Sequence, residues 1–210
     1  MLSSQKDLKM PKRNYYILGI EGVHAIGKST ILNFLAKKHT VYEERLCEVI
    51  PEHPYAAQLF FLSGYIQRDQ KIRSRIRKTA ASKKIIITDR TPFSALAYGY
   101  ATLSREEYDA LLTVYGSYRF LKEDLIFLLH ADPGIVIKRL KERKGNHRDL
   151  FGGRLLDEDF INLVSFSLEQ MIQKSGTPYI SLNVNGSTSL EISEKIEALI
   201  QNIISEPNRI

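Results

Sequence analysis

Apolar residues along the chain alternate between short runs of strand length and longer stretches with helical spacing. The short runs predict strands at 15–20, 39–43, 84–88, 125–129 and 179–182. Continuous β-branched residues in the run 84–88 are typical of a central parallel strand covered on both faces. Strands that alternate with helices are joined by right-handed crossovers, which put helices on both sides of a parallel sheet. The pattern therefore predicts a three-layer α/β/α fold with a five-stranded parallel sheet.

Helical spacing fills the intervals between these runs. It predicts helices at 29–38, 104–118 and 156–174, together with one long helix or two shorter ones over 56–81. Pro92 and Pro133 stand at first helical positions, where a missing N–H costs nothing. Capping-box spacing marks the start of the helix at 104, through Ser104-Arg105-Glu106-Glu107, and of a final helix over 188–204.

A phosphate-binding motif follows the first predicted strand. Residues 22–29 read GVHAIGKS and match G-x-x-x-x-G-K-[ST] at every fixed position. Between a strand and a helix, such a loop binds phosphate through backbone N–H groups, while Lys28 neutralises the β- and γ-phosphates and Ser29 holds Mg²⁺. The flanking strand and helix argue against a chance match in a glycine-containing turn. The residues expected to contact a nucleotide are Gly22, Ala25, Ile26, Gly27, Lys28, Ser29 and Thr30.

Carboxylates gather after the second predicted strand, at Glu43, Glu44, Glu48 and Glu52. Open α/β sheets bind ligands at the carboxyl ends of their strands, so a carboxylate here is well placed to act as a general base. Glu44 is the first choice, although its three neighbours stay open. A solvated acidic loop explains any single one of them about equally well.

Gln58, Phe61 and Tyr65 share one face near the start of the long helix, because they are three and four residues apart. Together they can form a pocket that stacks on a base and hydrogen-bonds its edge. Core packing is the favoured alternative for the two aromatic residues. A buried Gln58, by contrast, requires a partner.

Asp89 and Arg90 directly follow the central strand. An acid at this position can hold Mg²⁺, and a base can bind an anionic substrate. The alternative is a structural ion pair at the end of the strand.

A basic segment at 138–148 ends a predicted helix and runs into glycines at 145, 152 and 153. Arg139 and Arg143 are four residues apart and therefore lie on one face. We expect a lid over about 139–154 that excludes water and brings arginine to the phosphates. The alternative is a solvated basic loop.

Composition fits one compact domain without a membrane span. The chain has 210 residues, 43% of them hydrophobic and 26% charged, and no apolar run approaches the about 20 residues that cross a bilayer. Residues 1–14 are polar and basic, so we expect a flexible extension before a single domain at 15–210. The single cysteine, Cys47, excludes an intrachain disulfide and fits a reducing cytoplasm.

Net charge is +6, and basic residues cluster at 6–13, 68–84 and 138–148. Such clusters can bind nucleic acid through its phosphates. A protein that handles an anionic nucleotide, however, needs positive charge for that purpose alone. Nucleic acid binding is therefore the less favoured interpretation.

Together these motifs resemble the P-loop nucleoside and nucleotide kinases, in particular the deoxynucleoside kinase and thymidylate kinase group. The similarity runs from about residue 15 to the C-terminal helix, through Glu21-Gly22, Gly27-Lys28-Ser29-Thr30, Asp89-Arg90-Thr91-Pro92-Phe93-Ser94 and the arginines of 139–143. By spacing, Gln58 and Glu44 fall where deoxynucleoside kinases place a base-pairing glutamine and the catalytic carboxylate. The chain departs from the group at 23–26, where no acidic residue is present, and at Arg45, where proline is frequent.

The resemblance implies a P-loop NTPase fold with a helical lid, and transfer of the γ-phosphoryl group of ATP, with Mg²⁺, to a nucleoside or nucleoside monophosphate. It also implies that Asn185, in the loop after the fifth strand, contacts adenine, and that the long helix forms a homodimer. The expected catalytic residues are Lys28, Glu44, Arg90, Arg139 and Arg143, the metal ligands Ser29 and Asp89, and the substrate-binding residues Gln58, Phe61, Tyr65 and Arg90. A nucleotide-binding regulatory module and a kinase acting on nucleic acid ends stay open as alternatives.

Overall fold

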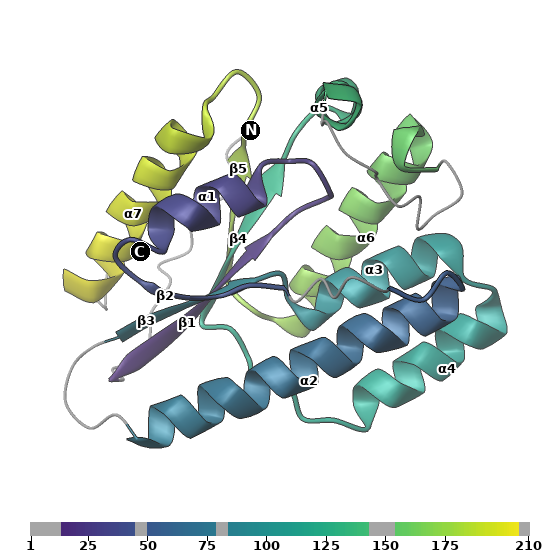
Figure 1. Cartoon of the computed structure of the whole chain (residues 1–210), viewed down its shortest axis with the longest axis horizontal. Helices are drawn as coiled ribbons and strands as arrows, with labels where there is room; N and C mark the ends of the chain where they lie inside the picture. Colours follow the sequence, from purple (N-terminus) through teal and green to yellow (C-terminus); the bar gives the residue numbers. More distant parts are fainter. Residues whose placement is uncertain (1–13, 45–49, 79–83, 143–153, 206–210) are drawn as a thin grey trace.

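The computed structural model describes residues 14–44, 50–78, 84–142 and 154–205. Its centre is a parallel sheet in the order β2-β3-β1-β4-β5 (Figure 1). The strands are β1 (Tyr15–Glu21), β2 (Thr40–Tyr42), β3 (Lys84–Asp89), β4 (Leu125–His130) and β5 (Tyr179–Asn183). The predicted five-stranded parallel sheet is therefore confirmed.

Helices cover both faces of the sheet (Figure 1). On one face lie α1 (Lys28–Leu35) and α7 (Ser189–Ser205), which pack against each other. The other face carries α2 (Pro54–Lys78), α3 (Pro92–Thr102) and α6 (Glu158–Ser175). α4 (Arg105–Gly116) packs against α2 and α3, while α5 (Pro133–Glu142) contacts α6 and the short 3₁₀ helix η1 (Arg154–Leu156). This arrangement gives the three predicted layers.

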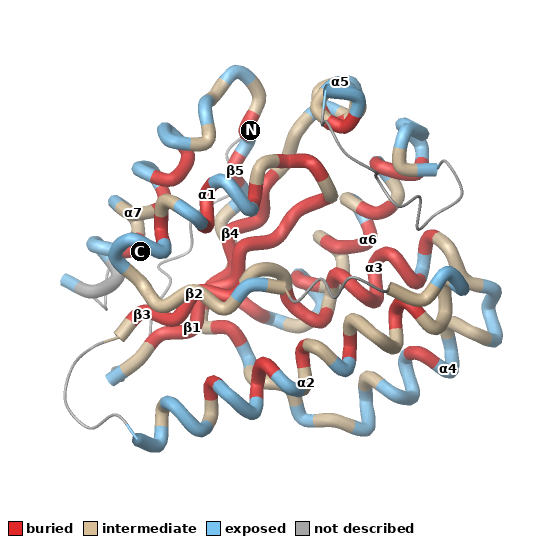
Figure 2. Tube along the Cα trace, in the orientation of Figure 1, coloured by how far each residue is buried: buried red, intermediate tan, exposed pale blue. Residues whose placement is uncertain are grey.

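The middle strands form the core because helices cover both of their faces. Tyr16, Leu18 and Ile20 of β1 have no exposed surface, and β4 is buried from Leu125 to Leu129 (Figure 2). Burying each such side chain stabilises the fold by about 1.5–3 kcal/mol. The sheet is therefore a rigid support for the residues at the ends of its strands.

Polar residues at the carboxyl ends of the strands belong to the sheet. Four strands continue one residue beyond the predicted apolar runs, and the added residues are Glu21, Asp89, His130 and Asn183. The apolar pattern stops at the first polar side chain, whereas the backbone ladder continues: the Arg90 N–H, for example, donates to the Ile20 carbonyl at 3.0 Å. Polar side chains thus lie at the carboxyl ends of four neighbouring strands.

The helices follow the sequence closely, with two corrections. The segment 56–81 is one unbroken helix over Pro54–Lys78. Helix α1 ends at Leu35, and the N–H groups of Lys37 and Lys38 then donate to carbonyls only three residues back, which is a tighter turn. The capping box of Ser104 and Glu107 is formed in both directions. None of the helices in the described ranges is long and apolar enough to span a membrane. The predicted extension at 1–14 and the lid at 139–154 lie largely outside those ranges.

Candidate active site

The loop after β1 turns back on itself through backbone conformations that favour glycine. Gly22 and Gly27 have φ angles of 144° and 108°, and Ala25 has φ 55°. A Cβ on Gly22 would lie 2.8 Å from the Leu129 carbonyl oxygen, so a side chain is excluded there. Gly27 is the N-cap of α1 and offers no side chain to the first N–H groups of the helix. The loop therefore has the form of an anion cradle.

Lys28 is buried against this loop. Its Nζ donates to the carbonyl oxygens of Gly22 and Val23, both at 2.7 Å. Burial, followed by the nearby positive charge of Arg90, lowers the pKa of Lys28 to about 7. Its ammonium group is thus held beside the cradle in an environment that disfavours its charge.

A cavity of about 260 Å³ opens at the carboxyl ends of β1, β2 and β3. It brings together most of the residues that the sequence singles out. Its lining includes Ala25, Gly27, Lys28, Ser29, Glu44, Gln58, Phe61, Tyr65, Asp89 and Arg90. Four parts of the chain therefore meet at one site: the phosphate loop, the segment after β2, the start of α2 and the end of β3.

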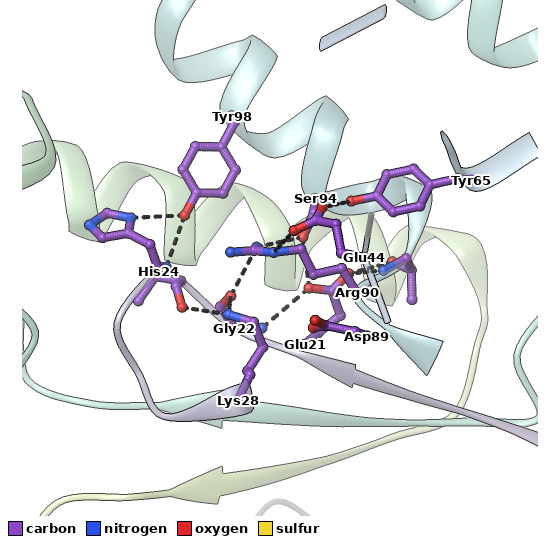
Figure 3. Close-up of polar contacts among 12 residues, drawn as sticks. Glu21, Gly22, His24, Lys28, Glu44, Tyr65, Asp89, Arg90, Ser94 and Tyr98 are labelled. Atoms are coloured by element: carbon purple, nitrogen blue, oxygen red, sulfur yellow. Dashed lines mark hydrogen bonds and ion pairs between the residues drawn. The ribbon is translucent and has the colours of Figure 1, made fainter. Parts of the chain in front are cut away.

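Glu44 is held inside this cavity by two donors (Figure 3). The Tyr65 hydroxyl donates to Oε1 at 2.5 Å, and Arg90 Nε pairs with Oε2 at 3.1 Å. Of the other three candidate carboxylates, Glu43 lines a neighbouring cavity, Glu52 is exposed, and Glu48 lies outside the described residues. Geometry therefore singles out Glu44.

Arg90 is aimed into the cavity by an unusual backbone. Its φ is 62°, in the left-handed region that disfavours a residue with a side chain. Besides Glu44, its guanidinium reaches the Gly22 carbonyl at 3.3 Å and Ser94 Oγ at 3.0 Å, and lies 5.5 Å from the centre of the Tyr98 ring. Arg90 thus pairs with Glu44, and the alternative of a structural ion pair with Asp89 does not hold.

Asp89 keeps a buried carboxylate oxygen free. Its Oδ1 has no hydrogen-bond partner in the part of the chain that the structure describes, and the residue lines the cavity together with exposed Ser29. A buried carboxylate oxygen without a donor is costly unless a cation or ligand meets it. Asp89 and Ser29 therefore form a donor set that fits a hard cation such as Mg²⁺.

Gln58, Phe61 and Tyr65 share one wall of the cavity, as their spacing predicts. Gln58 is 1% exposed, and neither atom of its amide has a hydrogen-bond partner among the described residues. Tyr65 also belongs to a small apolar cluster with Leu62 and Ala95, so the core-packing alternative holds for it in part. The unpaired amide of Gln58 is available to a ligand.

Two residues that organise the site escaped the sequence motifs. Glu21 is fully buried at the end of β1, and its carboxylate accepts from the backbone N–H and hydroxyl of Thr91 and, at 2.8 Å, from Ser94 Oγ (Figure 3). It thereby fixes the start of α3 beside Arg90. Sequence reasoning identified Glu21 only as part of a family resemblance. The periodicity does predict that it directly follows a buried strand.

His24 joins the phosphate loop to two other elements. Its Nε2 donates to the Leu155 carbonyl at 3.2 Å, and its Nδ1 lies 2.9 Å from the Tyr98 hydroxyl. The Tyr98 hydroxyl also accepts from the His24 backbone N–H at 3.0 Å. No sequence motif points to this contact, because Tyr98 lies 74 residues away along the chain.

Arg139, Asn185 and Thr30 are predicted residues that do not line the cavity. Arg139 Nη1 donates to the Ile26 carbonyl at 2.8 Å, so α5 does bring an arginine to the phosphate loop. Asn185 Oδ1 accepts from the Asp132 N–H at 3.0 Å, and Asn185 and Thr30 are not among the cavity-lining residues. Arg143 lies outside the described residues, so its role remains a prediction.

Comparison with known proteins agrees with this geometry. The family model for thymidylate kinase matches residues 20–158. A protein of Pyrobaculum aerophilum described as a probable thymidylate kinase is 30% identical over 145 residues, which are 61% of this chain and 71% of the relative.

Two solved kinases share the fold at low identity. A deoxyadenosine kinase from M. mycoides is 18% identical with a TM-score of 0.70, over 89% of this chain and all of that one. A thymidylate kinase from Candida albicans is also 18% identical, with a TM-score of 0.66 over 90% of this chain and 92% of that one.

The family model covers more than half of the chain, including the phosphate loop and all the residues that line the cavity. Its match favours catalysis over a purely regulatory nucleotide-binding module. The chain belongs to the thymidylate kinase family and is a nucleoside or nucleotide kinase.

Proposed function

We propose that this kinase transfers the γ-phosphoryl group of ATP to a hydroxyl group of a nucleoside. The observation that carries the proposal is the Glu44 carboxylate, which lies in the cavity with one oxygen paired to Arg90. A hydroxyl acceptor must lose a proton as it attacks phosphorus, and a carboxylate within reach can take that proton. An acceptor that is already a phosphate needs no such base.

The charge balance of the cavity supports the same acceptor. Among the described lining residues, Lys28 and Arg90 are the lysine and arginine side chains. Burial lowers the pKa of Lys28 to about 7, and Glu44 already offsets Arg90 at 3.1 Å. An acceptor phosphate beside Glu44 would be repelled by about 4 kcal/mol per unit charge at 4 Å and an effective dielectric constant near 20. A neutral nucleoside avoids this repulsion.

A nucleoside monophosphate is the second candidate acceptor. It is favoured by the P. aerophilum relative, which is described as a probable thymidylate kinase. Arg90 would then have to leave Glu44 and bind the acceptor phosphate. A nucleoside acceptor therefore leaves the ion pair of Glu44 and Arg90 intact, whereas a monophosphate acceptor requires that it break.

On the donor side, the cradle of 22–29 would bind the ATP phosphates, with Lys28 exchanging its two carbonyl contacts for phosphate oxygens. Ser29 and Asp89 would hold Mg²⁺, which supplies charge neutralisation on the phosphates when bound. Arg139 is near enough to the cradle to stabilise charge that spreads over the transferred group. Contact between Asn185 and adenine is proposed by family resemblance alone.

On the acceptor side, Glu44 takes the hydroxyl proton while Tyr65 and Arg90 keep its two oxygens in place. Each carboxylate oxygen retains a lone pair beyond the one its donor occupies. Gln58 would pair with the edge of the base, and Phe61 would lie beside it on the cavity wall. Base, sugar and phosphates would then follow the cavity from Gln58 to Lys28.

Replacing Gln58 with leucine should weaken acceptor binding without destabilising the fold. We expect the acceptor KM to rise about 10- to 100-fold, since a hydrogen-bonding side chain that faces the base is lost. The free energy of unfolding should stay unchanged or rise by about 1 kcal/mol, because two buried atoms without partners are removed. Gln70→Leu, at an exposed position on the same helix, is the matched control. A KM equal to that of the wild type would rule out base pairing by Gln58.

The acceptor is tested by measuring ADP release from ATP and Mg²⁺ with nucleosides, their monophosphates and short oligonucleotides. We expect stimulation by at least one nucleoside that exceeds stimulation by its monophosphate. The reverse order would favour the second candidate. Turnover only at oligonucleotide 5′ ends, with steep salt dependence, would instead identify a nucleic acid kinase.

A further inference from the structure

Arg68 is a buried cation that stands apart from the active-site cavity. It lies on α2, three residues after Tyr65, and is 6% exposed, although most of the basic residues that follow it on this helix face solvent. It lines a neighbouring cavity between β2 and α2 and is absent from the lining of the cavity that holds Gln58. A buried guanidinium is costly, so its retention calls for a role that an apolar side chain could not fill.

One set of Arg68 contacts fixes the end of β3. Its Nη1 donates to the carbonyl oxygens of Asp89, at 2.7 Å, and Arg90, at 3.0 Å. These carbonyls lie where the chain leaves the sheet and Arg90 takes its left-handed conformation, with φ 62°. Such a conformation persists only where surrounding contacts enforce it. Arg68 therefore holds the backbone that aims Arg90 into the active site.

A second contact fixes Tyr65. The guanidinium carbon of Arg68 lies 4.9 Å from the centre of the Tyr65 ring. The hydroxyl of that ring donates to one oxygen of Glu44, and Arg90 pairs with the other. One side chain thus supports both donors that hold Glu44.

These two contacts are the specific anchors of the guanidinium. Its Nε and Nη2 have no hydrogen-bond partner in the described part of the chain. Two buried carboxyl groups, Glu123 and Asp69, interact with its charge, but burial raises the pKa of both, that of Glu123 to about 7. The hydrogen-bonding capacity of Arg68 is therefore only partly used, and the bonds that it does make go to the backbone of Asp89 and Arg90.

We propose that Arg68 is a positioning residue for phosphoryl transfer, which fixes Tyr65 and the Arg90 backbone so that Glu44 and Arg90 meet the acceptor in one geometry. The inference rests on the proposed function, because Glu44 is the acceptor-side base there. Arg68 does not touch the acceptor. Its loss should therefore change the rate of the chemical step and leave ATP binding intact.

The test is Arg68→Met, which keeps the length of the side chain and removes its donors. With the acceptor that the wild type phosphorylates fastest, we expect kcat to fall about 10- to 100-fold, the effect of a small misplacement of catalytic groups. The Kd for ATP should change less than about twofold. Arg73→Met is the matched control, since Arg73 lies on the same helix and also donates to a carbonyl, that of Arg119 at 2.8 Å, away from the site. Its kcat should match the wild type.

Coupling to Glu44 separates positioning from a merely structural role. In a Glu44→Gln background, Arg68→Met should lower kcat by less than about threefold, because the group it positions is already disabled. An equal loss in both backgrounds, or a kcat within about twofold of the wild type for Arg68→Met alone, would overturn the proposal. If Arg68→Met does not fold, Arg68→Lys carries the same test with an expected loss of about 3- to 10-fold and the same coupling.

Failure of the proposed function is distinguishable from failure of this inference. If Glu44→Gln leaves turnover unchanged, the base role of Glu44 is wrong, and Arg90→Lys replaces it as the coupling background. Arg68→Met must still lower kcat in that case, because the Arg90 backbone has lost its support. A normal kcat would then reject Arg68 as a positioning residue independently of the acceptor.

Discussion

Glu44→Gln is expected to lower kcat for a nucleoside acceptor by about 10²- to 10⁴-fold, the usual contribution of a general base. Glutamine has nearly the same shape, so the cavity should keep its form, and Oε1 can still accept from Tyr65. The amide cannot take the acceptor proton, however, and it no longer offsets the charge of Arg90. The Kd for ATP should be close to that of the wild type, because the phosphate cradle is untouched.

The matched control is Glu43→Gln, which changes the preceding carboxylate but lies against the neighbouring cavity. Its kcat should stay within about twofold of the wild type, as for most substitutions away from a reacting centre. The pair of variants should be measured with a nucleoside and with its monophosphate. Nearly normal turnover of the nucleoside by Glu44→Gln would rule out Glu44 as the general base. Undiminished turnover of a monophosphate is expected, since no proton need be removed from that acceptor.

The predicted layers and the phosphate loop came from signals that are local in sequence. A β-branched run such as 84–88 is buried on both faces in almost any parallel sheet, so its pattern identifies a central strand. Gly22 and Gly27 have positive φ angles that favour glycine, and both are fixed positions of the short phosphate-binding motif. For the same reason Lys28 and Ser29 could be assigned to the cradle before their contacts were known.

The choice among the four candidate carboxylates required tertiary structure. Spacing along the chain places Glu43 and Glu44 next to each other, but only the fold brings Tyr65 and Arg90 to one of them. These partners are 21 and 46 residues away, and no periodicity connects them. Selection of Glu44 as the proposed base therefore depended on long-range contacts.

Arg68 shows where sequence patterns mislead. It falls in the basic cluster 68–84, which the sequence presents as a possible nucleic acid surface, yet it is buried and donates to two backbone carbonyls. Carbonyl groups at a strand end have no signature in side-chain identity, so their need for a donor cannot be read from the sequence. The contacts of Glu21 could not be predicted for the related reason that its partners, Thr91 and Ser94, are some 70 residues distant.

Lys28→Met should reduce turnover by about 10³-fold or more, because it removes the amine that becomes charged beside the phosphates when ATP binds. Methionine retains most of the aliphatic stem, so the loop should keep its packing. Lys37→Met, at an exposed position just after α1, is the matched control and should leave kcat unchanged. Turnover by Lys28→Met at the wild-type rate would contradict assignment of 22–29 as the donor site.

Lys28 should also make ATP binding dependent on pH. Without nucleotide its pKa is lowered to about 7 by burial and by Arg90, so it is largely neutral at pH 8. Phosphate oxygens favour the ammonium form, and bound ATP therefore raises this pKa and draws in about one proton at pH 8. Affinity should consequently fall as pH rises through 7, by at most about tenfold per pH unit. Calorimetric titration with ATP and Mg²⁺ in buffers of different ionisation enthalpy measures this proton uptake. The uptake should vanish in Lys28→Met. If the wild type binds ATP without taking up a proton, Lys28 is already charged in the free enzyme.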